Sequence, residues 1–270
     1  MALEKPTLLP ARENVYYNKR FRIKIRVRQS ANHLPVKLEK AMPLETMSSK
    51  SMPSKATLST TMPSTKQKLL TNPKLTANID IDDVTHFLLE LDALKRVNRR
   101  SYVTGTNRLE NSAEHSWHLA MACWSIAELF ELDVNHEKLL KMALIHDLGE
   151  IDAGDTFLYA DTRGDAHVEE RTGIARLQSE RGNGVADLSE VWEEQETGNS
   201  KETQLLRVVD RLLPFLLNLN TNGKTWIDAN VTRSQVAGAH GFIRDSFPSI
   251  HEWLAKQIDY ATKQGWLVDK

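Results

Sequence analysis

Apolar residues recur at helical spacing along most of the chain after residue 80. Asp82 and Asp83 precede apolar residues at 84, 87, 88, 91 and 94, which predicts an amphipathic helix with acidic residues in its first turn. Asn111 stands three positions before Glu114, the spacing of a capping box, so a second helix is expected to begin there and continue to about residue 129. We expect Trp117 and the later Trp124 of this helix to lie in the core.

The same periodicity continues towards the end of the chain. Asn135 or Asp133 caps a third helix, whose buried positions are 139, 140, 143 and 144. Further helices are predicted at 166–180, 185–196 and 204–218, and one or two more at 234–262. Strand alternation, internal repeats and a glycine-rich phosphate loop are not found. The pattern therefore predicts an all-α domain.

Composition divides the chain at about residue 76. Residues 1–76 carry 15 Lys/Arg against 4 Asp/Glu, a net charge of +11, whereas residues 77–270 carry 20 against 32, a net charge of −12. The stretch 47–65 is rich in Ser, Thr and Pro and has few large apolar residues, so burial cannot offset the entropy of ordering it. We predict a basic, disordered extension over 1–76 and one folded domain over 77–270.

The basic segment 17–28 alternates cationic and apolar residues, and three interpretations of it stay open. It is a dispensable extension, an organelle-targeting leader or a nucleic-acid-binding arm, the last being the least favoured. Cys123 is the single cysteine, which excludes an internal disulfide and is typical of a reducing compartment. No apolar run reaches the ~18 residues that a membrane span needs. We expect a cytoplasmic protein unless the basic segment directs it to an organelle.

The pair His146-Asp147 lies at the end of an apolar helical turn, within the segment Met142-Ala-Leu-Ile-His-Asp-Leu-Gly-Glu150. An imidazole and a carboxylate here could bind a cation if other helices brought further ligands. His115 and Asp210 are the candidates, and Asp210 lies on an otherwise apolar helix, where an unpaired carboxylate is costly to bury. A salt bridge from Asp210 to a neighbouring arginine is the alternative. Two imidazoles and two carboxylates suit one divalent ion such as Mn²⁺, Co²⁺, Fe²⁺, Zn²⁺ or Mg²⁺.

The order of these segments resembles the HD-domain superfamily of metal-dependent phosphohydrolases. The matching segments are Glu114-His115-Ser, then His146-Asp147-x-x-Glu150-x-x-x-Gly154-Asp155, then Val209-Asp210. Leu94-Lys-Arg-Val-Asn-Arg99 and Ile151-Asp-Ala-Gly-Asp155 are similar to the branch that contains 5′-deoxynucleotidases and their eukaryotic relatives. The resemblance covers roughly residues 83–220. It implies a helical bundle with a metal site between its helices.

The resemblance also implies roles for particular residues. His115, His146, Asp147 and Asp210 would bind the ion, which lowers the pKa of a bound water and screens the phosphate charge. Glu150 would position or deprotonate the attacking water, and Asp155 is the candidate general acid for the leaving oxygen.

Two neighbouring arginines are the candidates for substrate binding: the first matches a position of the family, and the second departs from its pattern. Arg99 stands where the nucleotidase branch has a phosphate-binding arginine, and a guanidinium pairs well with a phosphate. Bacterial members have Trp at the next position, where this chain has Arg100, so sugar preference and the choice between Arg99 and Arg100 stay open. His118, His136, His167, His240 and His251 are assigned to structural or surface positions.

We therefore predict hydrolysis of a nucleoside or deoxynucleoside 5′-monophosphate to nucleoside and phosphate. One alternative is an HD hydrolase that acts on another phosphoester or on a nucleoside triphosphate. A second alternative is a metal- or nucleotide-binding module without turnover. The expected partner is a small phosphate ester rather than nucleic acid or a membrane, and a homodimer stays open because members of the family often dimerise.

Overall fold

The computed structural model describes residues 79–160 and 163–268, together with two short strands near the N-terminus. These strands, β1 (Tyr17–Asn18) and β2 (Phe21–Arg22), pair antiparallel. The chain divides into two units, residues 1–67 and 68–270, which we describe separately. The predicted disorder of 1–76 and the role proposed for the basic segment fall almost entirely outside the described residues, so both stay predictions.

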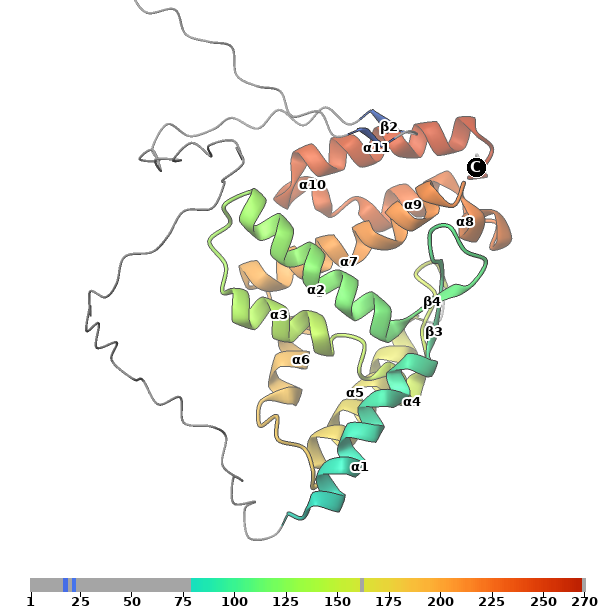
Figure 1. Ribbon diagram of the computed structural model, residues 1–270. Coiled ribbons are helices and arrows are strands. Elements are labelled where there is room, and N and C mark those ends of the chain that lie inside the picture. The colour runs from blue at the N-terminus through green and yellow to red at the C-terminus, as the bar shows by residue number, and fades with distance from the viewer. Residues whose placement is uncertain (1–16, 19–20, 23–78, 161–162, 269–270) are drawn as a thin grey trace, which may run out of the picture. The chain divides into compact units, whose positions relative to one another are not determined.

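Helices make up most of the second unit, as predicted, and Figure 1 shows their arrangement. The first half contains α1 (Ile81–Asp92), the 3₁₀ helix η1 (Ala93–Arg96), α2 (Ser112–Leu129), α3 (His136–Ile145), α4 (Glu150–Ala153) and α5 (Arg163–Ser179). The second half contains α6 (Leu188–Thr197), α7 (Lys201–Asn220), α8 (Lys224–Asp228), α9 (Arg233–His240), α10 (Ile243–Ser246) and α11 (Pro248–Lys263). Residues 234–262, predicted to form one or two helices, thus belong to three.

Two of the predicted helix starts have the expected caps. The side chain of Asn111 accepts a hydrogen bond from the backbone N–H of Glu114, and the Glu114 carboxylate accepts one from the N–H of Asn111, which completes the capping box of α2. Asn135, rather than Asp133, caps α3 through the N–H of Lys138. Each cap satisfies a backbone donor that the helix leaves unpaired and so fixes where the helix begins.

Helix α7 lies between two apolar clusters, which explains why most of its sides are apolar. Leu206 and Val209 pack with residues of α2 and α3, whereas Phe215 and Leu219 pack with α8, α9 and α11. A third cluster joins α1, α5 and α6 around Trp192. In Figure 1, α7 runs between α2 and the pair formed by α9 and α11. A polar residue on α7 is therefore held at a fixed place in the interior.

One element contradicts the prediction that the domain has no strands. Strands β3 (Asn98–Tyr102) and β4 (Leu109–Asn111) pair antiparallel, with an irregular register between the pairs Asn98–Asn111 and Tyr102–Leu109. The sequence of β3 is Asn-Arg-Arg-Ser-Tyr, which lacks the alternation of apolar and polar residues that identifies a strand. The hairpin forms because it connects η1 to α2, and it contains both candidate substrate arginines.

The expectation for the two tryptophans of α2 is also wrong. Trp117 and Trp124 expose 66% and 45% of their surface. The buried face of α2 consists of smaller side chains, among them Leu119, Cys123 and Ala127. Among the described residues, no helix is long and apolar enough to cross a membrane.

Helix α3 offers a matched test of this packing. Leu139 is fully buried in the cluster with α2 and α7, as predicted, whereas the prediction that Leu144 is buried is wrong, since it is 54% exposed. We expect Leu139→Ala to lower the free energy of unfolding by about 2–5 kcal/mol, because it removes buried apolar surface and leaves a cavity. Leu144→Ala should change it by less than about 0.5 kcal/mol. Urea unfolding of both variants measures the difference, and equal losses would contradict the assigned core.

Candidate functional site

Three helical segments bring the four predicted metal ligands together. His115 lies in the first turn of α2, and its position follows from the capping box at Asn111. His146 and Asp147 follow α3 directly, and Asp210 lies in the middle of α7. The contacts of α2 with both α3 and α7 hold these segments at one place.

Short contacts link the ligand atoms of these residues in pairs, and Asp210 lies outside the group formed by the other three. The Nε2 atom of His115 is 3.0 Å from Oδ1 of Asp210, and Nε2 of His146 is 3.0 Å from Oδ1 of Asp147. The two imidazole rings have centroids 5.3 Å apart. One ligand atom from each of His115, His146 and Asp147 falls within a 4.8 Å group. This spacing fits ligands that surround one cation.

A hydrogen bond behind His146 and a carboxylate behind His115 are placed so that Nε2 of each ring faces the centre. The Nδ1 atom of His146 is 2.9 Å from the carbonyl oxygen of Ala143, so an Nδ1–H can donate to it and leave Nε2 as the electron-pair donor. The Nδ1 atom of His115 is 3.5 Å from Oε2 of Glu110, a buried carboxylate. Metal-binding histidines typically have such a carbonyl or carboxylate behind the ring.

The buried polar atoms at the centre also support the fit of these residues to a bound cation. Nε2 of His146 and Nδ1 of His115 are buried and lack a hydrogen-bond partner among the described residues. Unpaired buried polar atoms are rare and costly, and a metal ion would provide the missing interaction for Nε2 of His146. The His₂Asp₂ donor set thus fits a divalent cation of borderline or hard character.

The electrostatics of the centre favour ionised carboxylates. Burial alone would raise the pKa of Asp147, but His146 and Arg99 outweigh it and lower the pKa to about 2. Burial also acts on Asp210, where the hydrogen bond with His115 and the charge of Arg211 hold the pKa well below its usual value. Burial would lower the pKa of His146, but Asp147 and Asp210 raise it to about 9. In the metal-free protein, a proton on His146 thus balances part of the negative charge.

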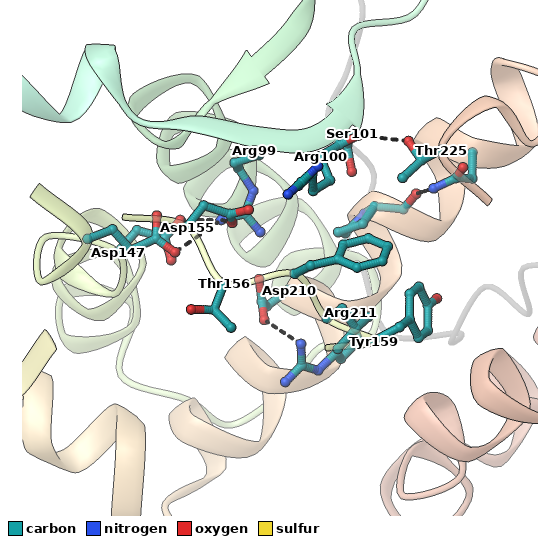
Figure 2. Close-up of a pocket in the computed structure, with 15 residues that line it drawn as sticks. Arg99, Arg100, Ser101, Asp147, Asp155, Thr156, Tyr159, Asp210, Arg211 and Thr225 are labelled. Atoms are coloured by element: carbon teal, nitrogen blue, oxygen red, sulfur yellow. Dashed lines mark hydrogen bonds and ion pairs between the residues drawn. The ribbon is translucent and has the colours of Figure 1, made fainter. Parts of the chain in front are cut away.

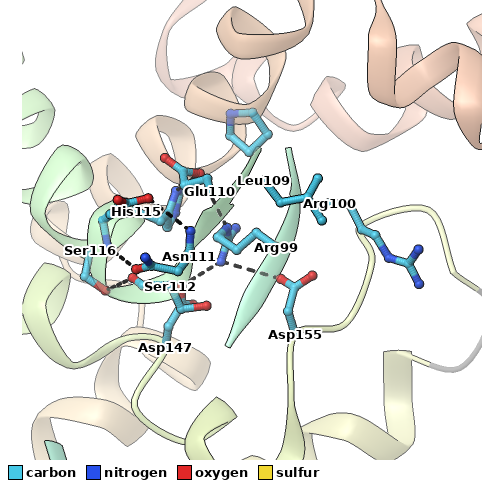
Figure 3. A network of polar contacts seen from close by, with 12 residues as sticks. Arg99, Arg100, Leu109, Glu110, Asn111, Ser112, His115, Ser116, Asp147 and Asp155 are labelled. Carbon is cyan, nitrogen blue, oxygen red and sulfur yellow. Dashed lines mark hydrogen bonds and ion pairs between the residues drawn. The ribbon is translucent and has the colours of Figure 1, made fainter. Parts of the chain in front are cut away.

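Arg99 lies at the middle of a group of buried carboxylates, as Figure 3 shows. Its Nη1 atom donates to Oδ2 of Asp147 at 2.6 Å and lies 3.6 Å from Oδ1 of Asp155. The carboxylates of Glu150 and Glu110 are each 3.9 Å from the guanidinium. Burial lowers the pKa of Arg99, but these acids more than compensate and raise it. Arg99 is therefore a permanent cation inside the site.

Glu150, one of the two predicted catalytic acids, is buried beside the centre. The Ser112 hydroxyl donates a hydrogen bond of 2.6 Å to its carboxylate, and burial together with the charge of Asp147 raises its pKa to about 9, although Arg99 opposes this. Its backbone is fixed by close packing, since a Cβ atom on Gly149 would lie 2.7 Å from the carbonyl oxygen of Glu170 on α5.

Asp155, the second predicted acid, follows a turn that depends on a glycine. Gly154 has φ of +78°, a conformation that other residues rarely adopt, and it directs the chain from α4 back towards Arg99. Burial and the carboxylate of Asp147 raise the pKa of Asp155, although Arg99 opposes this. Asp152, two residues before the glycine, instead pairs with Arg176 on α5, at 2.8 Å, away from the centre.

Two cavities meet at the candidate centre and share Asp147, Glu150, Thr156, Asp210 and Arg211. The first cavity, of about 80 Å³, is bounded by β3, α7 and the loop 156–159, and Figure 2 shows its lining. Both Arg99 and Arg100 contribute to it. The second cavity, of about 470 Å³, extends past His146 towards α5, α6 and Arg207. A ligand at the centre therefore has room in two directions.

The sequence analysis missed several residues of the site. Glu110 and Ser112 were not identified because each supports another residue instead of matching a motif of its own. His167, assigned to a structural or surface position, lies in the second cavity with Nδ1 3.3 Å from Glu170 and 3.1 Å from Glu196. These three residues form a second group with metal-binding side chains. These residues lie on two helices, α5 and α6, and no spacing in the sequence indicates that they meet.

Comparisons with known proteins identify the family of this chain. A family model described as an HD domain matches residues 91–251, which include every residue of the candidate centre. The crystal structure of a predicted metal-dependent phosphohydrolase from Magnetospirillum magnetotacticum is 33% identical in sequence, with a TM-score of 0.62. That alignment covers 69% of this chain and 95% of the bacterial protein.

Two curated relatives have names that state an activity. The 5′-deoxynucleotidase HDDC2 of Danio rerio is 29% identical over 136 residues, which form 49% of this chain and 66% of the relative. The 5′-deoxynucleotidase YfbR of Escherichia coli is 35% identical over 75 residues, which form 26% of this chain and 37% of the relative. The chain thus spans less than two thirds of the length of these relatives.

The role of Asp210 can be tested by thermal unfolding in the presence of a metal. A cation that binds only the native protein stabilises it by about 2.7 kcal/mol at a hundredfold excess over Kd. We expect Mn²⁺ to raise the melting temperature of the wild type and to have no such effect on Asp210→Ala, which removes one ligand. Asp245→Ala, at an exposed position of α10, is the control and should keep the full shift. An unchanged shift in Asp210→Ala would exclude Asp210 as a ligand.

The carboxylate behind His115 can be tested in the same way. Glu110→Gln removes the negative charge next to Nδ1 of His115, and loss of such a partner typically weakens metal binding about 10–100-fold. Isothermal titration with Mn²⁺ measures the change in Kd. Glu190→Gln, at an exposed position of α6, is the matched control. Equal affinities in the two variants would show that Glu110 does not support His115.

Proposed function

Because this chain belongs to the HD domain family, we propose that it is a divalent-metal-dependent phosphohydrolase that acts on nucleoside or deoxynucleoside 5′-monophosphates. One observation supports this most strongly. Two oriented imidazoles and two ionised carboxylates converge beside a buried pair of acids, Glu150 and Asp155, and a permanently charged arginine, Arg99. A site that only bound a metal would not need the acids or the arginine.

The metal and the arginines have complementary tasks in this proposal. When bound, the cation would lower the pKa of a water molecule and screen the charge of the phosphate. Arg99 would hold the phosphate beside the centre, since its guanidinium faces the cavity and can form paired hydrogen bonds to phosphate oxygens. Arg100 lines the same cavity and would bind a further part of the substrate.

Glu150 and Asp155 would move the two protons of the hydrolysis. With its pKa raised to about 9, Glu150 is protonated in the metal-free protein, and a cation bound beside it would favour its ionised form. The water oxygen would then bond to phosphorus while one of its protons passes to the Glu150 carboxylate, and the bond from phosphorus to the ester oxygen would break. Asp155 gives its proton to that oxygen, so the products are inorganic phosphate and an alcohol, here the nucleoside. The raised pKa of Asp155 supports this role, since it makes the carboxyl group easier to protonate than an ordinary aspartate.

The names of the relatives support the choice of substrate. The relatives from Danio rerio and Escherichia coli are both named 5′-deoxynucleotidases, and both matches are partial. A nucleoside also fits the second cavity, where the carboxylates of Glu170 and Glu196 could accept hydrogen bonds from sugar hydroxyls.

A panel of metals and substrates tests the proposal. We expect the full-length chain, loaded in turn with Mn²⁺, Co²⁺, Zn²⁺ and Mg²⁺, to release phosphate from ribo- or deoxynucleoside monophosphates with at least one metal. Asp147→Ala should abolish this release because it removes a ligand and the main partner of Arg99. The proposal fails if no metal gives turnover, or if the turnover survives in Asp147→Ala.

The role of Asp155 can be distinguished from general damage by changing the leaving group. We expect Asp155→Asn to lower kcat on the nucleotide about 10²–10⁴-fold, because the variant cannot donate a proton to the sugar oxygen. The loss on 4-nitrophenyl phosphate should be much smaller, since that leaving group departs without protonation. Asp152→Asn, which changes the residue paired with Arg176, is the control and should affect neither substrate strongly. Equal losses on both substrates would show that Asp155 is not the general acid.

A further inference from the structure

Arg100 and Arg211 are two cations of the first cavity that the proposed reaction leaves without a clear task. Arg100 lies on β3 and Arg211 on α7, so different elements bring them to the same cavity. Figure 2 shows both among the lining side chains, together with the loop that includes Thr156 and Tyr159. Arg99 differs from both, because four carboxylates already surround it.

The guanidinium of Arg100 has no hydrogen bond or ion pair with any residue that the structure describes. Its backbone is nevertheless fixed, because the Thr225 hydroxyl donates a hydrogen bond of 2.8 Å to the Arg100 carbonyl oxygen. In Figure 3 the side chains of Arg99 and Arg100 leave β3 in different directions, and only Arg99 joins the carboxylate network. Arg100 is exposed to solvent at the cavity and is thus available to a ligand.

Arg211 has one weak partner. Its Nη1 atom is 3.9 Å from Oδ2 of Asp210, which is too long for a hydrogen bond, and its side chain is 25% exposed. A cation bound by Asp210 would compete for the same carboxylate. Arg207, one turn earlier on α7, shows the contrast, since it donates to the carbonyl oxygens of Gln195 and Glu196. Arg207 is fixed in place, whereas Arg211 retains most of its capacity to bind an anion.

The acids of the cavity have closer partners than these two arginines, although the charges of Arg100 and Arg211 also act on Asp155 and Asp210. Asp147 and Asp155 face Arg99, and Asp210 faces His115. The remaining lining near Arg211 is neutral, because burial raises the pKa of Tyr159 to about 12 and so keeps its phenol protonated. The cavity is therefore acidic at the metal centre and cationic on the side of Arg100 and Arg211.

We propose that Arg100 and Arg211 form a binding site for a second phosphate group, so that the preferred substrate contains two phosphates. This inference rests on the proposed function, in which the scissile phosphate occupies the metal centre beside Arg99. A phosphate carries about 1.5–2 negative charges near neutral pH, and guanidinium groups bind it through paired, charge-assisted hydrogen bonds. The second phosphate is bound and not transferred. In a 3′,5′-bisphosphate the water oxygen would bond to the 5′-phosphorus and the ester bond would break as before. In a 5′-diphosphate it would bond to the terminal phosphorus, the P–O–P bond would break, and the leaving group would be the nucleoside monophosphate.

Two kinds of nucleotide offer such a group. In a nucleoside 5′-diphosphate, the second phosphate continues the chain at the same sugar carbon, whereas in a nucleoside 3′,5′-bisphosphate it is a separate ester. We infer only the shared feature, a second phosphate within reach of both arginines. The experiment distinguishes the two sources, because each compound is compared with the monophosphate of the same nucleoside.

Steady-state kinetics of the metal-loaded, full-length protein test the proposal. We expect kcat/KM of the wild type to be at least about tenfold higher for one of the two-phosphate compounds than for the monophosphate, the gain of one charged hydrogen bond. Arg100→Gln and Arg211→Gln should each reduce this ratio, and the double variant should bring it close to one. Arg244→Gln, at an exposed arginine of α10, is the control and should keep the ratio. No preference in the wild type, or a ratio that the double variant retains, would overturn the inference.

Binding measurements keep this test independent of turnover and of folding defects. Isothermal titration of the Mn²⁺-loaded protein with each compound gives the ratio of Kd values even if no substrate is hydrolysed. A tighter Kd for a two-phosphate compound, lost in the double variant while the Mn²⁺-induced melting shift remains, would support the second site. Equal Kd values for mono- and two-phosphate compounds would exclude it. If no compound is hydrolysed but a two-phosphate compound still binds more tightly than the monophosphate, the proposed function is rejected and the second binding site is not.

Discussion

The guanidinium of Arg99 lies 2.6 to 3.9 Å from carboxylate oxygens of Asp147, Asp155, Glu110 and Glu150. Buried carboxylates are costly unless they are paired, and removing one partner of such a group leaves an uncompensated charge. Arg99 thus makes it physically acceptable to place several acids beside a metal site in the interior. Arg99 lies on β3, so this polar hairpin brings the guanidinium to the acids. The sequence of the hairpin alone does not reveal this.

The need to hold these charged groups at fixed positions explains the packing around the centre. Asp210 can be held next to His115 because α7 is fixed between two apolar clusters. Gly149 allows α5 to approach the segment before Glu150, and Gly154 turns the chain so that Asp155 faces Arg99. The apolar core provides rigidity, and the glycines provide close approach, so that charged groups keep separations of 3–4 Å without collapsing onto one another.

Predictions from the sequence were most accurate where residues close together in the chain determine the structure. The cap at Asn111 and the periodicity of α2 and α3 fixed the helices, and the ordered segments around His115 and His146 matched the residues that the structure brings together. Such predictions failed where contacts between distant segments determine which side chains are buried. Trp117 is apolar but faces solvent, because small residues of α2 occupy the tight contacts with α3 and α7.

Supporting residues were missed for a related reason. Glu110 and Ser112 act through His115 and Glu150, and such partners depend on how β4 and α2 meet, which no spacing in the chain records. The contrast between Arg99 and Arg100 is of the same kind. Adjacent residues of a strand point to opposite faces, so the two arginines enter different surroundings once β3 forms. Only the structure shows that Arg99 lies among the acids whereas Arg100 makes no ion pair with the described residues.

The centre and its surroundings therefore differ in how they are built. The groups that would perform the chemistry are buried, paired with one another and fixed by helices, so a change at any of them disturbs the charge balance around Arg99. Arg100 and Arg211 lie at the margin, where few described residues compete for them. Substitution of Arg100 would alter which ligand is favoured and leave the ion pairs of Arg99 in place. A chain with this division can keep one reaction while its substrate changes.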